Sequence, residues 1–68
     1  METIDARGLS CPEPVVLTRN ALRDKPASLA VLVDDFAPRE NVTRFAKHEG
    51  YDVEVVETED GWTLNLTK

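Results

Sequence analysis

The chain has 68 residues, which leaves room for one hydrophobic core, so we predict a single domain over residues 1–68 with the 41% hydrophobic composition of a soluble protein. Its thirteen acidic and eight basic residues give a net charge of −5, which argues against direct nucleic-acid binding, because phosphates call for a clustered basic surface. No apolar run is long enough to cross a membrane and no signal peptide is recognisable, so we expect a cytoplasmic protein without membrane contact.

Four segments have the hydrophobic pattern of β-strands. Residues 3–6 predict a short strand, and the continuous apolar run 29–33 predicts a buried central one. Residues 51–55 and 62–67 alternate apolar and polar side chains, which is typical of half-buried strands. The intervening Glu59-Asp60-Gly61 is a hairpin turn signal.

A first helix is predicted to begin beside the cysteine. Proline is tolerated in the first turn, where backbone N–H groups have no partner inside the helix. We therefore place Pro12 at N1, Pro14 at N3 and Cys11 at the N-cap. The helix should run to about Asp24, because Lys25-Pro26 ends it.

The faces of this helix follow from its period of 100° per residue. Arg19 and Arg23 fall on the exposed face. Val16 also falls on the polar side, one turn from Cys11, where it is either a contact for a partner or an ordinary exposed apolar residue. The predicted buried face consists of Val15, Leu17, Thr18, Ala21 and Leu22.

A second helix is predicted between the central strand and the hairpin. Asp35 can cap it, Pro38 lies in its first turn, and Gly50 ends it. Its buried stripe is predicted to contain Val42, Phe45 and Ala46. The resulting order, β-α-β-α-β-β, predicts a two-layer α/β sandwich with two helices on one face of the sheet and water on the other.

Cys11 is the candidate catalytic residue, because it carries a nucleophilic sulfur atom at the predicted start of a helix. A thiolate is the nucleophilic form of cysteine, and the positive end of a helix dipole favours it. Glu13 opposes activation, and Arg7 or Arg19 can offset that effect. The alternative is an inert buried cysteine, which is weakened because cysteine is a poor capping residue. As it is the only cysteine, any disulfide chemistry is intermolecular, which fits a reducing compartment.

The sequence lacks the residues that other catalytic mechanisms need. His48 is the only histidine and is predicted to be solvated near a helix end, so a Cys-His dyad is not expected. One cysteine and one histidine cannot make a zinc site, and the acids near the hairpin lack calcium-loop spacing. The three isolated glycines form no phosphate loop. We therefore expect no metal and no cofactor. A single activated thiol without catalytic partners is better suited to carrying a chemical group than to multistep catalysis.

The residues around the cysteine resemble the signature of a known protein family. The segment Asp5-Ala6-Arg7-Gly8-Leu9-Ser10-Cys11-Pro12-Glu13-Pro14 matches the D-x-x-G-x-x-C-P-x-P signature of the TusA/SirA/YedF sulfur-carrier family, and the resemblance covers the whole chain. It looks most like the YedF-type branch in Val33-Asp34-Asp35, in residues 39–45 and in Gly50-Tyr51. The resemblance implies a mixed four-stranded sheet in the order 1-2-4-3.

The resemblance also implies a function. Cys11 would accept sulfane sulfur as a persulfide from a protein donor, such as a cysteine desulfurase or a rhodanese, and relay it to an acceptor protein, as a sulfurtransferase-type relay rather than a turnover enzyme. Gly8, Pro12, Glu13 and Pro14 would shape the site. Arg19, Arg23 and Val16 are plausible partner contacts, although solvated arginines are the alternative. We expect a monomer. A competing hypothesis is a non-catalytic interaction or regulatory module of the same fold.

Overall fold

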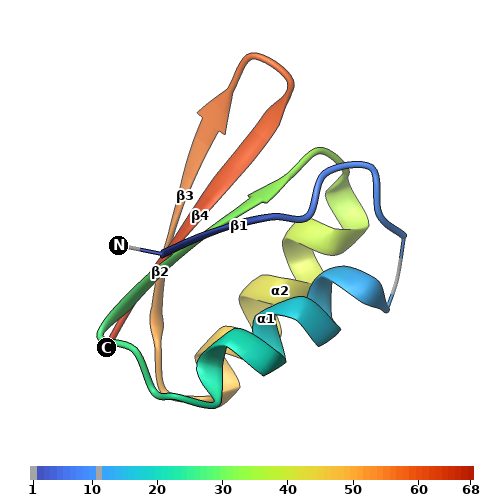
Figure 1. The fold of residues 1–68 in the computed structure, drawn as a ribbon. Coiled ribbons are helices and arrows are strands. Elements are labelled where there is room, and N and C mark those ends of the chain that lie inside the picture. Colours follow the sequence, from blue (N-terminus) through green and yellow to red (C-terminus); the bar gives the residue numbers. More distant parts are fainter. Residues whose placement is uncertain (1, 11) are drawn as a thin grey trace.

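The structure, a computed structural model, describes residues 2–10 and 12–68 and contains the six elements in the predicted order. They are β1 (Glu2–Asp5), α1 (Glu13–Leu22), β2 (Ser28–Val33), α2 (Phe36–His48), β3 (Asp52–Thr58) and β4 (Gly61–Thr67). The sheet order is β1-β2-β4-β3, with β1 parallel to β2 and the other pairs antiparallel. Both helices cover one side of this sheet (Figure 1), which confirms the predicted fold.

The hydrophobic core lies between the helices and one face of the sheet. The register places Leu29 of β2 beside Leu66 of β4, and Val31 beside Leu64. All four side chains are fully buried because the helices cover this face. Leu32 points to the opposite face and is only half-buried. The central strand β2 therefore buries the side chains that face the helices, and these alternate along the strand with side chains that face the open side of the sheet.

The buried face of α1 is rotated from the predicted one. Pro14, Thr18 and Leu22 are its buried residues, and they form a line at positions i, i+4 and i+8. Leu17, predicted to be buried, is 37% exposed because it lies at the margin of that line. The prediction was wrong here because it left Pro14 out of the packing face.

The end of α1 also differs from the prediction. The helix ends at Leu22 and not near Asp24. Lys25 adopts a left-handed conformation with a φ of 51°, and its N–H donates to the Leu22 carbonyl oxygen at 3.0 Å. This local turn ends the helix before Pro26 can do so.

Both ends of α2 follow from the residues that were expected to set them. The Asp35 carboxylate accepts a hydrogen bond from the Phe36 N–H at 2.7 Å and caps the helix. At the other end, Gly50 has a φ of 90° and its N–H donates to the Lys47 carbonyl, while the Tyr51 N–H donates to the Ala46 carbonyl. This pair of bonds is a Schellman motif, which needs a left-handed residue at the glycine position. Within the part of the chain that the structure describes, no helix is long and apolar enough to span a bilayer.

Candidate functional site

The start of α1 differs from the predicted arrangement. The N-cap residue is Pro12, and Glu13 and Pro14 are the first two helical residues, whereas Cys11 was expected at the cap and Pro12 at N1. The reason lies in the backbone bonding, because the Pro12 carbonyl accepts the Val16 N–H at 3.0 Å and so begins the helical ladder. Cys11 itself, with its predicted cap position and its thiol, lies outside the described residues.

The residues on either side of Cys11 are joined across it. The Ser10 carbonyl oxygen accepts a hydrogen bond from the Glu13 N–H at 2.9 Å, which links the end of the preceding loop to the first residue of α1. Pro14 is buried, and its carbonyl oxygen accepts the buried Thr18 hydroxyl at 2.9 Å. The downstream side of the cysteine is therefore fixed to the body of α1.

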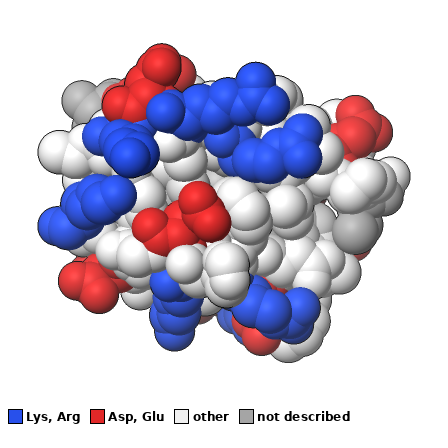
Figure 2. Space-filling model, turned by 90° about the horizontal axis from the view of Figure 1, so that it is seen from below, with Lys and Arg blue, Asp and Glu red and all other residues white. Residues whose placement is uncertain are grey.

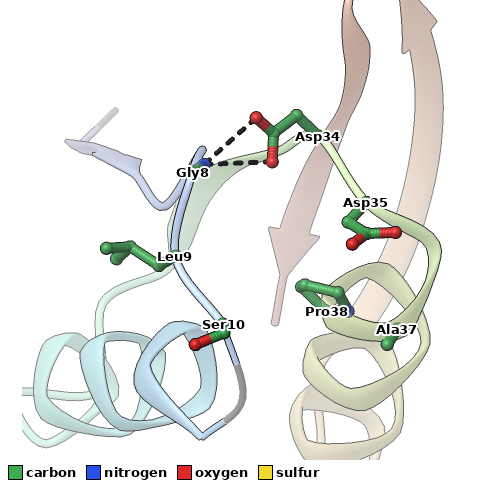
Figure 3. A pocket seen from close by; sticks show the side chains of 7 residues that line it. All are labelled: Gly8, Leu9, Ser10, Asp34, Asp35, Ala37 and Pro38. Carbon is green, nitrogen blue, oxygen red and sulfur yellow. Dashed lines mark hydrogen bonds between the residues drawn. The ribbon is translucent and has the colours of Figure 1, made fainter.

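The upstream side is fixed to the end of β2. The Gly8 N–H points at the Asp34 carboxylate, with its nitrogen 3.0 and 3.1 Å from the two oxygens (Figure 3). Gly8 has a φ of 77°, a left-handed conformation that L side chains rarely adopt. The loop therefore needs glycine at this position and an acceptor at position 34.

Arg7 ties the same loop to two further carboxylates. Its guanidinium donates to both oxygens of Asp5 at 2.9 Å and reaches Asp60, in the β3–β4 turn, at 3.4 Å. The hydrogen bonds from Arg7 lower the pKa of the Asp5 carboxyl to about 2, and those to Asp5 raise the pKa of Arg7. Since Arg7 serves these carboxylates, it is not a free charge for offsetting Glu13.

A polar cavity lies where β1 and β2 end and α2 begins. It has a volume of about 460 Å³ and is lined by the loop residues Gly8, Leu9 and Ser10 together with Asp34, Asp35, Ala37 and Pro38 (Figure 3). The carboxyl ends of parallel strands are the usual place for sites in α/β sheets. The cavity stands beside the cysteine in the sequence, since Ser10 is its neighbour.

A second hollow lies between the two helices and is mostly apolar. It has a volume of about 470 Å³ and is lined by the N-cap residue Pro12, by Val15 of α1, and by Asn41, Arg44, Phe45 and His48 of α2. The two sequence neighbours of Cys11 therefore line different hollows, Ser10 the polar one and Pro12 the apolar one. We call the second hollow the interhelical groove.

The remaining predicted site residues lie along α1 and α2. Arg19 and Arg23 are exposed, and Val16 is half-buried rather than fully exposed. His48 is largely solvated, as predicted, with 83% of its side chain exposed and Nδ1 3.4 Å from the Glu49 carboxylate. It nevertheless borders the interhelical groove, and this was not foreseen.

The helix side of the molecule is richer in basic groups than the net charge of −5 indicates. Figure 2 shows Lys and Arg side chains gathered over the face seen from below, where Figure 1 places the helices, with fewer acids among them. Among the described residues, no group of three or more histidine, cysteine, aspartate or glutamate side chains is arranged to hold a metal ion.

Sequence reasoning missed the contribution of Asp34 and Asp60 to the loop. Asp34 directly follows the buried strand β2, and that position was the available signal, because a polar residue at a strand's carboxyl end faces the site edge of the sheet. Asp60 was marked only as part of the hairpin turn signal, and its contact with Arg7 depends on where the folded hairpin places that turn.

Comparison with known proteins gives consistent matches. The family model described as Sulfurtransferase TusA matches residues 2–68. The sulfur carrier protein TusA of Pseudomonas syringae pv. syringae is 35% identical over 63 residues, which cover 90% of this chain and 75% of that protein, and its counterpart in Pseudomonas savastanoi pv. phaseolicola is 33% identical over the same shares. The crystal structure of a SirA-like protein from Desulfitobacterium hafniense superposes with a TM-score of 0.88 at 35% identity, covering 98% of this chain and 96% of the other.

Proposed function

Because the chain belongs to the TusA family of sulfurtransferases, we propose that it is a sulfur carrier in which Cys11 holds sulfane sulfur as a persulfide. The observation that carries this proposal is the segment from Asp5 to Pro14, which contains the family signature and the only cysteine of the chain. Hydrogen bonds from Gly8 to Asp34 and from Glu13 to Ser10 hold this segment on both sides of the cysteine.

The chemistry needs no cofactor and no net oxidation. The Cys11 thiolate attacks the outer sulfur of a persulfide on the donor protein, a new S–S bond forms at Cys11, and the donor cysteine leaves as a thiolate. In the second half, an acceptor group removes the outer sulfur and Cys11 leaves as a thiolate. Each half exchanges one S–S bond for another bond to the same sulfur, so the protein relays sulfur without accumulating a product.

The start of α1 favours the thiolate that this reaction requires. The N-terminal end of a helix carries partial positive charge, and a cysteine beside it ionises more easily than a free one. Pro12 and Pro14 contribute no N–H groups, so the effect comes from the dipole and from the remaining amides of the first turn. The exposed Glu13 carboxylate works against it.

We further propose that donor and acceptor proteins dock on the helix side of the site. The interhelical groove begins at Pro12, next to the reactive residue, and offers apolar surface for a partner side chain. Exposed Arg19 on α1 and Arg23 at its C-cap, with Arg44 at the groove, suit a partner that carries acidic groups around that apolar contact. Val16 is half-buried on α1 and would lie at the rim of such a contact.

The finer assignment within the family rests on sequence. Residues 39–45 and the strand end Val33-Asp34-Asp35 look like the YedF-type branch, so we assign the chain to that branch. A selenium atom can be carried by the same thiol chemistry, and the choice between sulfur and selenium belongs to the donor. We expect the carrier to act as a monomer in the cytoplasm, because a persulfide relay needs a compartment in which thiols stay reduced.

An intact-mass experiment tests the proposed function. The protein is incubated with a cysteine desulfurase and cysteine, beside the variant Cys11→Ser. We expect the parent protein to gain the mass of one sulfur atom, to lose it on addition of a thiol reductant, and the variant to gain nothing. Circular dichroism of the variant checks that its fold is intact.

The same experiment separates the competing hypothesis. A non-catalytic interaction module would bind its partner equally well with serine at position 11 and would take up no sulfur. A failure to load with several desulfurases and with a rhodanese, in a folded protein with a free thiol, would refute the carrier proposal.

A further inference from the structure

The outer edge of β3 has no neighbouring strand. β3 is the last strand of the sheet and pairs only with β4 in the part of the chain that the structure describes. In an antiparallel pair every second residue directs its N–H and C=O away from the neighbour, so this seven-residue strand presents a row of unpaired backbone groups. Figure 1 shows the β3–β4 hairpin projecting past the helices, which leaves the edge open to an extended chain.

Two valines on this strand are exposed on opposite faces of the sheet. Val55, which is 44% exposed, lies beside Leu64 on the helix side, and Val56, which is 41% exposed, lies beside Thr63 on the open side. β-Branched residues favour strands because they pack against cross-strand neighbours, and here each valine has such a neighbour on one side only. One added strand would cover both valines at once.

The charge of the same segment restricts which strand can be added. Residues 52–60 contain five acidic and no basic residues. Within the described chain, Asp60 pairs with Arg7, whereas Asp52, Glu54, Glu57 and Glu59 form no ion pair. An acidic strand would meet repulsion along this edge, and a basic one would supply the missing partners.

We propose that β3 is a docking edge for an extended basic segment of a partner protein, which pairs with it as a fifth strand. The order of acidic and apolar residues along β3 determines which side chains that segment must carry. In antiparallel alignment, basic side chains stand opposite Glu57, Glu54 and Asp52, and apolar side chains stand opposite the three valines between them. The segment therefore has the order basic, apolar, apolar, basic, apolar, basic.

This proposal is independent of the sulfur chemistry, because it uses no residue of the Cys11 loop. Its test measures peptide binding to ¹⁵N-labelled protein by amide chemical shifts. One capped hexapeptide has the matching order Lys-Val-Val-Lys-Val-Lys, and the control has the same composition and charge in the inverted order Val-Lys-Lys-Val-Lys-Val. We expect shifts confined to β3 and its turn, with the matching peptide binding roughly three- to hundredfold more tightly, the range for its three cross-strand charge pairs.

Two matched pairs of substitutions complete the test. Glu54→Gln with Glu57→Gln removes two charges from the edge and should weaken binding of the matching peptide by a similar factor. Glu40→Gln with Glu49→Gln removes two charges from α2 and its C-cap and should leave the affinity for the matching peptide unchanged. The proposal is overturned if the spectra show no shifts, shifts scattered over acidic residues of the whole surface, or equal affinity for the two peptides; in those cases the edge acids only prevent unwanted strand pairing.

Discussion

At the scale of single residues, Asp34 connects the core of the fold to the reactive loop. It follows directly after β2, whose Leu29, Val31 and Val33 side chains are buried beneath the helices, and its carboxylate accepts the Gly8 N–H. Gly8 is three residues from Cys11, and positioning a reacting group to within a fraction of an ångström is worth large factors in rate. Asp34 is therefore a positioning residue for the proposed thiol chemistry.

Two different substitutions of Asp34 test that role. We expect Asp34→Ala to slow persulfide loading of Cys11 by roughly tenfold, since a loosened loop loses its alignment. Asp34→Asn keeps an oxygen acceptor for Gly8 and should load close to the parent rate. Loading is followed by intact mass against time.

The neighbouring carboxylate supplies the control for this comparison. Asp35→Ala removes the cap of α2 and costs about 1 kcal/mol of stability, yet leaves the Gly8 bond in place. If Asp35→Ala slows loading as much as Asp34→Ala does, or if Asp34→Asn behaves like alanine, then the hydrogen bond to Gly8 does not position the thiol.

At the scale of elements, the sequence correctly predicted the features that depend on local patterns and missed the contacts between segments that are distant in the chain. The strands 29–33 and 62–67 and the ends of α2 were foreseen, because alternation, a capping aspartate and a terminal glycine act locally. The cap of α1 was placed one residue early, because two prolines satisfy several positions of a first turn equally well. The groove and the Gly8–Asp34 contact join residues 26 or more positions apart, which no local pattern encodes.

Gly61 illustrates this difference. It was identified as part of a turn signal, for which a positive φ is the usual reason. The structure gives positive φ to Gly8 and Gly50 among the described glycines, and not to Gly61. A Cβ at position 61 would instead lie 2.1 Å from the Val33 carbonyl oxygen and 2.8 Å from the Asp34 Cα. Glycine is needed there because β4 begins directly against the end of β2.

This close approach predicts a ranking of glycine substitutions. Gly61→Ala should lower the free energy of unfolding by roughly 3 kcal/mol, the upper end for overpacking, because the clashing atoms are backbone. Gly50→Ala meets open space and should cost only about 1 kcal/mol for its left-handed φ. Urea unfolding of the two variants gives the comparison, and equal losses would contradict the steric argument. Because Asp34 is among the clashing residues, Gly61→Ala should also slow loading of Cys11.

At the scale of the whole molecule, charge is divided unequally between the helix layer and the sheet layer. Six of the eight basic residues lie in residues 12–25 and 36–50, which form the helix layer, together with four of the thirteen acids. The remaining two basic and nine acidic residues lie in the sheet, its loops and its hairpin. The overall charge of −5 therefore conceals a helix side with a small positive excess beside the reactive loop. An acidic partner is attracted to this side, which includes Pro12 at the start of α1, while the acidic sheet repels it from the other side.

This orientation effect makes the rate of sulfur transfer sensitive to salt and to where charge is removed. Exposed charges are screened beyond about 8 Å at physiological ionic strength, so steering acts mainly at low salt. We expect Arg19→Gln with Arg23→Gln to slow loading by a desulfurase with an acidic docking surface roughly tenfold at low salt, and the deficit to vanish as salt rises toward molar concentration. The matched control, Thr3→Glu with Thr67→Glu, makes the same change in net charge on exposed positions of the sheet and should load at nearly the parent rate. Equal slowing by both pairs would mean that net charge alone governs the encounter, and no slowing by either would mean that Arg19 and Arg23 are merely solvated.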